Sequence, residues 1–168
     1  MIRTSMPAAA ALIALLAPIE AGAVDPLPTE THKFLPIALA FEAAQSAMAQ
    51  CKGQGYNVTV TIVDWNGQVK LLAVADNGNR LGPSLSRRKA YTSAVLRQST
   101  GDYKKRVATQ GAFNPGVFDA ELTTEQGGLP IKVGNETIGA IGVSGAPGGD
   151  KDEACASAGL AKIGDRLL

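Results

Sequence analysis

Two hairpin patterns constrain the fold of this 168-residue chain more than any other feature. In the first, apolar and polar residues alternate over 57–63, and Asp64–Gly67 supplies a turn before a second strand over 68–75. In the second, residues 129–133 and 137–144 flank a short turn. Strands joined by tight turns pair in opposite directions, so the sequence predicts an antiparallel sheet.

Helical patterns surround these hairpins. Apolar stripes at helical spacing predict helices over residues 36–52, 83–96 and about 99–107, and a last helix that begins at Asp150. Glu153 follows Asp150 by three positions, as in a capping box. This order of helices and hairpins predicts an α+β domain, with the first and last helices on one face of the sheet.

The first 23 residues have the pattern of an export signal. Arg3 precedes the apolar run 8–16, and Ala21–Ala23 fits the small-residue cleavage rule. The run is too short to cross a bilayer, which needs ~20 apolar residues. We therefore expect a signal peptide over 1–23, a single domain over 24–168, and a periplasmic or secreted product without a membrane span.

Composition excludes several classes of function. A net charge of +1 and eight aromatic residues give no reason to expect nucleic acid or an acidic membrane surface as the main partner. One histidine and two cysteines cannot form a four-ligand zinc site of the common types within one chain.

The two cysteines, Cys51 and Cys155, lie on the predicted first and last helices. In an oxidising compartment two such residues form a candidate disulfide, which would stabilise the fold by about 4 kcal/mol for a loop of about 100 residues. Two buried thiols that act as small hydrophobic groups are the alternative. We favour the disulfide, because both helices are expected to pack on the same face of the sheet.

A basic segment occupies the middle of the second predicted helix. Arg87 and Tyr91 are four residues apart, as are Arg88 and Thr92, and Lys89 lies between them. Each pair can share a helix face and offer a cation and a hydroxyl to an anionic ligand. An ordinary solvated helix face is an equally good interpretation.

Few other residues suggest chemistry. Ser144 lies in a Gly-x-Ser-Gly-Ala pattern that departs from the nucleophile elbow, and the only histidine is far away in sequence, so we do not expect a serine hydrolase. The loop that begins at Gly145 can cradle a carboxylate or phosphate at the start of the last helix, although a flexible turn is the simpler interpretation. His32 can serve as a haem ligand, or can simply be exposed.

These segments together resemble the GlcG/HbpS family of small haem-binding-type proteins, and in particular its exported members. The resemblance covers residues 35–168. Its motifs are Ala43–Ala44, Gly55–Tyr56, Val58–Asp64 with Gly67, Ser86–Thr92, Gly127–Ile131 and, longest and most specific, Ile138–Ala156.

The resemblance implies a profilin-like antiparallel sheet of about five strands flanked by helices. It also implies homo-oligomers, often of eight subunits, and haem or iron binding in several members. Cysteines at the positions of Cys51 and Cys155 look like a recurring pair in the exported members. A haem site needs cations near an apolar groove, which Arg87, Arg88 and Lys89 could supply for the propionates, with an axial ligand from His32, Tyr91, Thr92, a methionine or a neighbouring subunit.

Three functions follow as hypotheses. The leading one is an exported, oligomeric haem-binding protein without catalytic turnover. The second is an enzyme or accessory subunit that acts on a small anionic organic acid through the basic helix and the glycine loop. The third is a structural oligomer that binds a protein partner.

Overall fold

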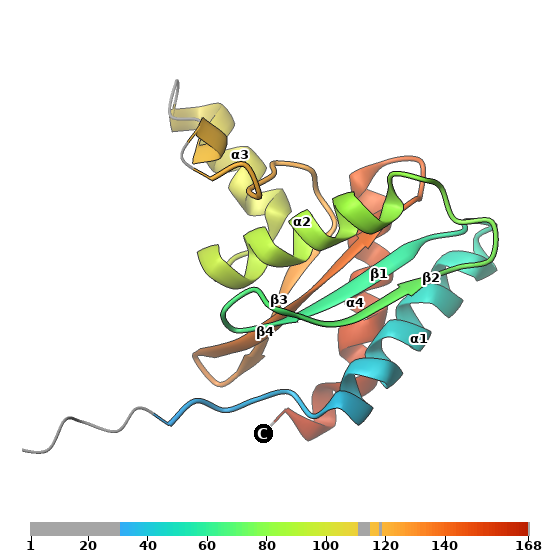
Figure 1. The fold of residues 1–168 in the computed structure, drawn as a ribbon, viewed down its shortest axis with the longest axis horizontal. Coiled ribbons are helices and arrows are strands. Elements are labelled where there is room, and N and C mark those ends of the chain that lie inside the picture. Colours follow the sequence, from blue (N-terminus) through green and yellow to red (C-terminus); the bar gives the residue numbers. More distant parts are fainter. Residues whose placement is uncertain (1–30, 111–114, 118, 168) are drawn as a thin grey trace, which may run out of the picture. The chain divides into compact units, whose positions relative to one another are not determined.

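A computed structural model describes residues 31–110, 115–117 and 119–167, so the predicted signal peptide lies outside the described residues. Internal contacts divide the chain after Thr31, and the unit described below begins at His32. The helices and strands of this unit, labelled in Figure 1, are α1 (Ile37–Gly53), β1 (Thr59–Asp64), β2 (Val69–Val74), α2 (Gly82–Leu96), α3 (Thr100–Gln110), the short 3-10 helix η1 (Pro115–Val117), β3 (Gly128–Val133), β4 (Glu136–Ser144), α4 (Gly149–Ile163) and the 3-10 helix η2 (Gly164–Arg166).

The sheet confirms the predicted α+β class. Its strand order is β2-β1-β4-β3, and every neighbouring pair is antiparallel. The described residues form four strands, whereas about five were expected. Between α2 and β3, the described residues form α3, η1 and irregular chain.

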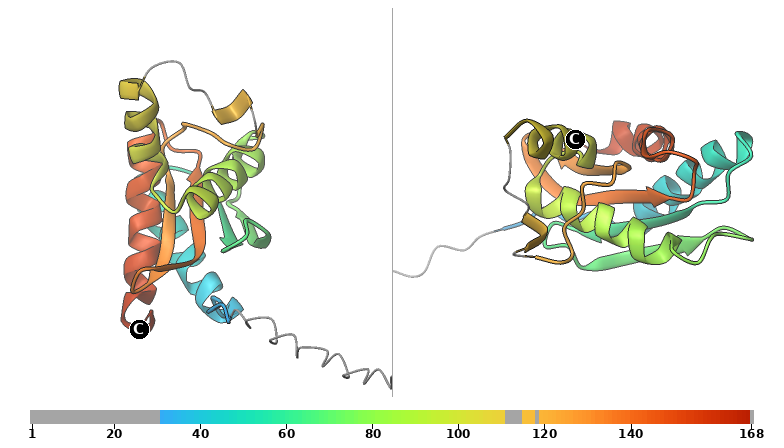
Figure 2. Two further views of the ribbon diagram at one scale, coloured as in Figure 1. Left: turned by 90° about the vertical axis from the view of Figure 1, so that its left-hand side faces the viewer. Right: turned by 90° about the horizontal axis from the view of Figure 1, so that it is seen from above.

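Helices cover the two faces of the sheet differently (Figure 2). Helices α1 and α4 pack against each other and against one face, where the main apolar core lies. Helix α2 lies on the other face, against β1, β3 and β4. Cys51 and Cys155 form a disulfide that joins α1 to α4, with their Cα atoms 5.6 Å apart. The predicted pairing and the shared face of the two helices are therefore confirmed.

The central strand β1 is buried on both faces, which its polar alternation did not predict. Thr61 faces α2, and its hydroxyl lies 2.7 Å from the hydroxyl of Ser86. On the same side, a Cβ atom at Gly142 would overlap the backbone of Ser86 and Ala90. Glycine at this position of β4 thus lets α2 pack close to the sheet.

Helix α4 begins without the predicted capping box. Its N-cap is Gly148, no side chain caps it, and Asp150 lies within the first turn. Gly148 has a φ of 125°, a conformation that residues with a Cβ rarely adopt. The amides of the first turn therefore have neither an intrahelical acceptor nor a side-chain cap. None of the described helices is long and apolar enough to cross a bilayer.

Candidate functional site

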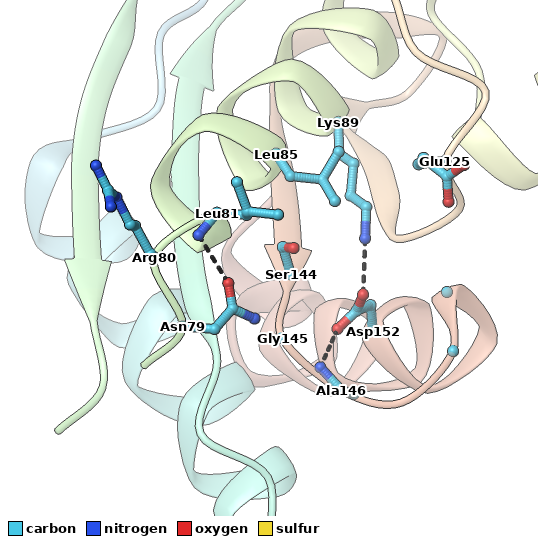
Figure 3. A pocket seen from close by; sticks show the side chains of 12 residues that line it. Asn79, Arg80, Leu81, Leu85, Lys89, Glu125, Ser144, Gly145, Ala146 and Asp152 are labelled. Carbon is cyan, nitrogen blue, oxygen red and sulfur yellow. Dashed lines mark hydrogen bonds and ion pairs between the residues drawn. The ribbon is translucent and has the colours of Figure 1, made fainter. Parts of the chain in front are cut away.

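A pocket of about 360 Å³ lies between α2 and the loop that leads into α4 (Figure 3). Its walls come from three separate parts of the chain: the start of α2 with the residues before it, the β4–α4 loop, and the segment before β3. The lining residues are Asn79, Arg80, Leu81, Leu85, Lys89, Glu125, Ser144, Gly145, Ala146, Gly148, Gly149 and Asp152.

A buried ion pair forms one wall of this pocket. Lys89 Nζ donates to Asp152 Oδ2 at 2.7 Å and to the carbonyl oxygen of Val143 at 2.9 Å. The other carboxylate oxygen of Asp152 accepts the amide of Ala146 at 2.9 Å. The side chains of Lys89 and Asp152 are only 2% and 5% exposed. The pair therefore ties α2, β4 and the first turn of α4 together in a site from which water is largely excluded.

Small residues around Lys89 explain how a charged side chain is buried here. Ser86, Ala90 and Ser93 follow the same inner face of α2 and are themselves buried. Such a stripe lets the helix approach the sheet and leaves the long lysine side chain to extend to its partner. Burial raises the pKa of the Asp152 carboxyl, while Lys89 and the backbone amides of Ala146 and Gly145 oppose that shift.

Ser144 and Gly145 form the floor of the pocket. Gly145 has a φ of 136°, and a Cβ there would crowd the backbone of Asn57 and Val58. Ser144 is only 4% exposed, and its hydroxyl makes no hydrogen bond to any other residue that the structure describes (Figure 3). The pocket wall thus includes a hydroxyl that bonds to no described residue, and the first residues of α4 line the same pocket.

Arg87 and Tyr91 do share a helix face, as predicted, but protein groups engage both. Arg87 forms a salt bridge with Glu121, and the Tyr91 hydroxyl donates to Asp119 Oδ2 at 2.7 Å. This hydrogen bond and partial burial raise the pKa of Tyr91 above its ordinary value of 10.0.

The second predicted pair is also turned toward the chain. Arg88 donates to the carbonyl oxygen of Leu122 at 2.8 Å, and the buried hydroxyl of Thr92 accepts the amide of Thr123 at 2.9 Å. The structure does not bring Arg87, Arg88 and Lys89 together at one site, because they follow different faces of α2. Of the predicted ligand-binding residues, only Lys89 and Gly145 line the pocket beside α4.

His32 lies at the other end of the sheet. Strands β1 and β4 pair along their length. Thr59 pairs with Ser144 at the end beside the pocket, and Asp64 pairs with Gly139 at the opposite end. His32 is exposed and stacks on Trp65, in the turn after Asp64, with the ring centroids 4.2 Å apart. His32 is therefore separated from the pocket and from Lys89 by the length of the strands.

The described residues fit haem at an exposed face and not in an enclosed cavity of one chain. His32 provides an imidazole, and the exposed rings of Phe34 and Trp65 provide apolar surface nearby. Three pockets of about 360, 290 and 200 Å³ in the described part of the chain do not include His32 in their walls. No cluster of three or more metal-binding side chains occurs among the described residues. A haem held here by His32 would need a second surface to cover it.

Sequence reasoning missed several residues of the site. It did not identify Asp152 or Ser144 as pocket residues, nor the acidic segment with Asp119 and Glu121 that engages α2. The small residues Ser86 and Ser93, on the same face as Lys89, are the signal that could have marked this lysine as buried. No local pattern indicates that residues 119–123 cross α2.

Comparisons with known proteins agree on one family. Residues 35–161 match the model of a family described as "Haem degrading protein HbpS-like". The protein GlcG of Escherichia coli K12 is 29% identical over 116 residues, which cover 68% of this chain and 84% of GlcG.

Solved structures give the same result. The crystal structure of a double mutant of Streptomyces reticuli HbpS is 30% identical, covers 92% of this chain and 97% of that one, and has a TM-score of 0.72. The structure of a PduOC haem complex shares the fold, with a TM-score of 0.71 at 21% identity over 78% of this chain and 96% of that one. The match of the family model over most of the described domain, and the shared fold, show that this chain belongs to the HbpS-like family.

Proposed function

We propose that this protein is an exported, oligomeric haem-binding protein that acts without catalytic turnover, and that His32 provides the iron ligand. Membership of the HbpS-like family supports the haem-binding part of this proposal. Export, assembly and the absence of turnover go beyond that membership, and the last departs from the family's description as haem degrading. The crystal structure of a PduOC haem complex, a protein of the same fold, is consistent with it. Bound haem would supply a redox-active iron and a strong visible absorption.

The position of His32 supports its role as a ligand. Its ring is exposed and is oriented by stacking on Trp65. The indole of Trp65 thus gives this surface a flat apolar group beside the imidazole. Phe34, two residues from His32 in sequence, is 73% exposed. These residues would orient the imidazole and pack against the ring, whereas the hydroxyls of Tyr91 and Thr92 already form hydrogen bonds to Asp119 and Thr123.

An unpaired sheet edge supports assembly into a homo-oligomer. Strand β2 is an edge strand, and Val69, Leu72 and Val74 on it are 40–47% exposed. Ile37 and Phe41 on α1, which contacts β2, are about half exposed. Exposed apolar edge strands favour association, so we propose that a second copy of this chain covers this surface and encloses the haem site.

Haem titration tests the ligand directly. The protein expressed from Val24 should give a saturable Soret shift, and His32→Ala should weaken haem binding at least tenfold. Asn66→Ala, in the same turn as Trp65, should bind like the unchanged protein. Equal binding by His32→Ala would exclude His32 as the ligand, and no Soret shift in any form would exclude the haem-binding function.

The absence of turnover needs its own measurement. The Soret band of the loaded protein should persist under air with ascorbate present. Steady loss of the band, with release of iron, would show haem degradation and contradict the non-catalytic part of the proposal.

Native mass spectrometry of protein exported from full-length expression tests the remaining parts. It should find a chain that begins at Val24 and an oligomer, and Leu72→Lys should lower the subunit count. Val95→Lys, which alters an exposed residue on α2, is the matched control. An uncleaved chain would contradict export, and a monomer would contradict assembly.

A further inference from the structure

We propose that the pocket between α2 and α4 binds a short-chain monocarboxylate, with the carboxylate at Ser144 and the first turn of α4 and the aliphatic part against Leu81 and Leu85. This site lies at the opposite end of the sheet from His32 and does not depend on the haem proposal.

A surplus of hydrogen-bond donors at the floor of the pocket points to an oxyanion. Lys89 has three N–H donors, of which two are used by Asp152 and Val143. The amide of Gly149 has no intrahelical acceptor and no cap, and the first hydrogen bond of the helix runs from the amide of Asp152 to Gly148 at 3.3 Å. Both carboxylate oxygens of Asp152 are already used.

Ser144 is the second and independent observation. The residue is only 4% exposed and lines the pocket, and its hydroxyl has no partner among the described residues (Figure 3). Buried polar groups in folded proteins are usually hydrogen-bonded, so an unused hydroxyl at the floor of a pocket indicates a place for a ligand atom. Ser144, Lys89 and Gly149 all line this pocket.

The charges limit the ligand to one negative charge. Arg80 and Lys89 are balanced by Glu125 and Asp152, so the side chains that line the pocket sum to zero. The start of α4 adds a partial positive charge of about half a unit, which Asp150 in the same first turn opposes. A single carboxylate is therefore favoured, whereas a phosphate dianion would be repelled by two nearby carboxylates.

The apolar wall of the pocket indicates which group the ligand carries besides its carboxylate. Leu81 and Leu85 lie across the pocket from Ser144, and Leu81 is 73% exposed where nothing covers it. A volume of about 360 Å³ is near the lower end for small-molecule sites. A short aliphatic chain would cover Leu81 while its carboxylate reaches the floor.

Backbone amide NMR of the protein expressed from Val24 tests the proposal with butyrate, butyramide and inorganic phosphate as probes. Butyrate should give saturable shifts confined to residues 144–149 and to the start of α2, while butyramide and phosphate should bind at least tenfold more weakly. Loss of one hydrogen bond to a charged ligand should make Ser144→Ala bind butyrate about tenfold more weakly. Ser84→Ala, at an exposed position of α2 outside the pocket, is the matched control.

Each result decides the proposal. Preserved amide shifts elsewhere in Ser144→Ala establish that this variant is folded, so its loss of binding supports the site. The proposal is overturned if butyrate gives no saturable shift at the pocket, if Ser144→Ala binds as the unchanged protein does, or if phosphate or butyramide binds as tightly as butyrate. Haem binding by His32 would be unaffected by any of these outcomes.

Discussion

The two faces of the sheet are covered by different kinds of residue. The face covered by α1 and α4 is a continuous apolar core closed by the disulfide. On the face covered by α2, the buried apolar cluster is small, comprising Val63, Ala90, Ala94 and Ala140, and threonines, serines and the Lys89–Asp152 pair fill much of the rest. Apolar burial and a disulfide stabilise the fold, but they do not position hydrogen-bond donors or charged groups for a ligand. The α2 face positions polar groups, which is why the pocket forms there.

The largest expected effect comes from the ion pair on the α2 face. Lys89→Met leaves Asp152 buried without its cation and should lower the free energy of unfolding by about 3–5 kcal/mol. Urea denaturation measures this loss. Lys89→Met with Asp152→Leu should recover most of it, because no uncompensated charge remains; a single variant as stable as the unchanged protein would mean that the pair does not hold this face.

The disulfide is the matching test on the α1 and α4 face. Replacement of Cys51 and Cys155 by alanine opens a link across 104 positions and should cost about 2–4 kcal/mol of unfolding free energy. Urea denaturation of the double variant, compared with the native protein under oxidising conditions, gives the value. The pocket should persist, so unchanged butyrate-induced amide shifts are expected; their loss would show that the two faces are coupled.

Tyr91 gives a smaller effect that depends on pH. Tyr91→Phe removes the hydrogen bond to Asp119 and should cost about 1 kcal/mol. Because the pKa of Tyr91 is raised in the folded protein, its contribution is complete below the ordinary pKa of 10.0 and is lost as pH rises through the folded value. The difference between the native protein and Tyr91→Phe should therefore shrink above pH 10, as measured by denaturation at several pH values. Tyr56→Phe controls for loss of a phenol, and a constant difference would contradict the assignment.

The exposed pair of Glu42 and Arg166 should have the smallest effect. Arg166 donates to both carboxylate oxygens of Glu42, at 2.9 and 2.6 Å, and these bonds lower the pKa of Glu42 from 4.5. Its contribution is present above pH 4.5 and is lost as pH falls through the lowered value. Thermal unfolding of Glu42→Gln should therefore approach that of the native protein in acid. A difference that grows in acid would contradict this sign.

Local patterns were enough for much of the fold. The apolar stripe over residues 36–52 and the turn Asp64–Gly67 specify their elements within a few residues, because helix and strand periodicity are local properties. The predicted capping box at Asp150 and Glu153 was wrong, because the helix begins at Gly149 after a glycine N-cap and Asp150 is its second residue. The burial of Thr61 depends on α2, which is distant in sequence.

Candidate residues were less predictable than elements. The helical spacing of Arg87 with Tyr91 and of Arg88 with Thr92 correctly placed each pair on a face. What each face meets is decided by the segment 119–123, which has no pattern that directs it to α2. The sequence could therefore propose cations for a ligand but could not show that protein groups already engage all three of them.

The amino-acid sequence by itself determined the α+β class, the boundaries of its main elements and the family resemblance, because these follow from periodicity and motifs along the chain. Only the tertiary structure decided that Cys51 and Cys155 meet, that Lys89 is buried against Asp152, and that Ser144 faces a pocket while His32 lies at the other end of the sheet. The physical reason is that burial and pairing depend on residues brought together from distant positions, and their energies depend on the surroundings that the fold creates.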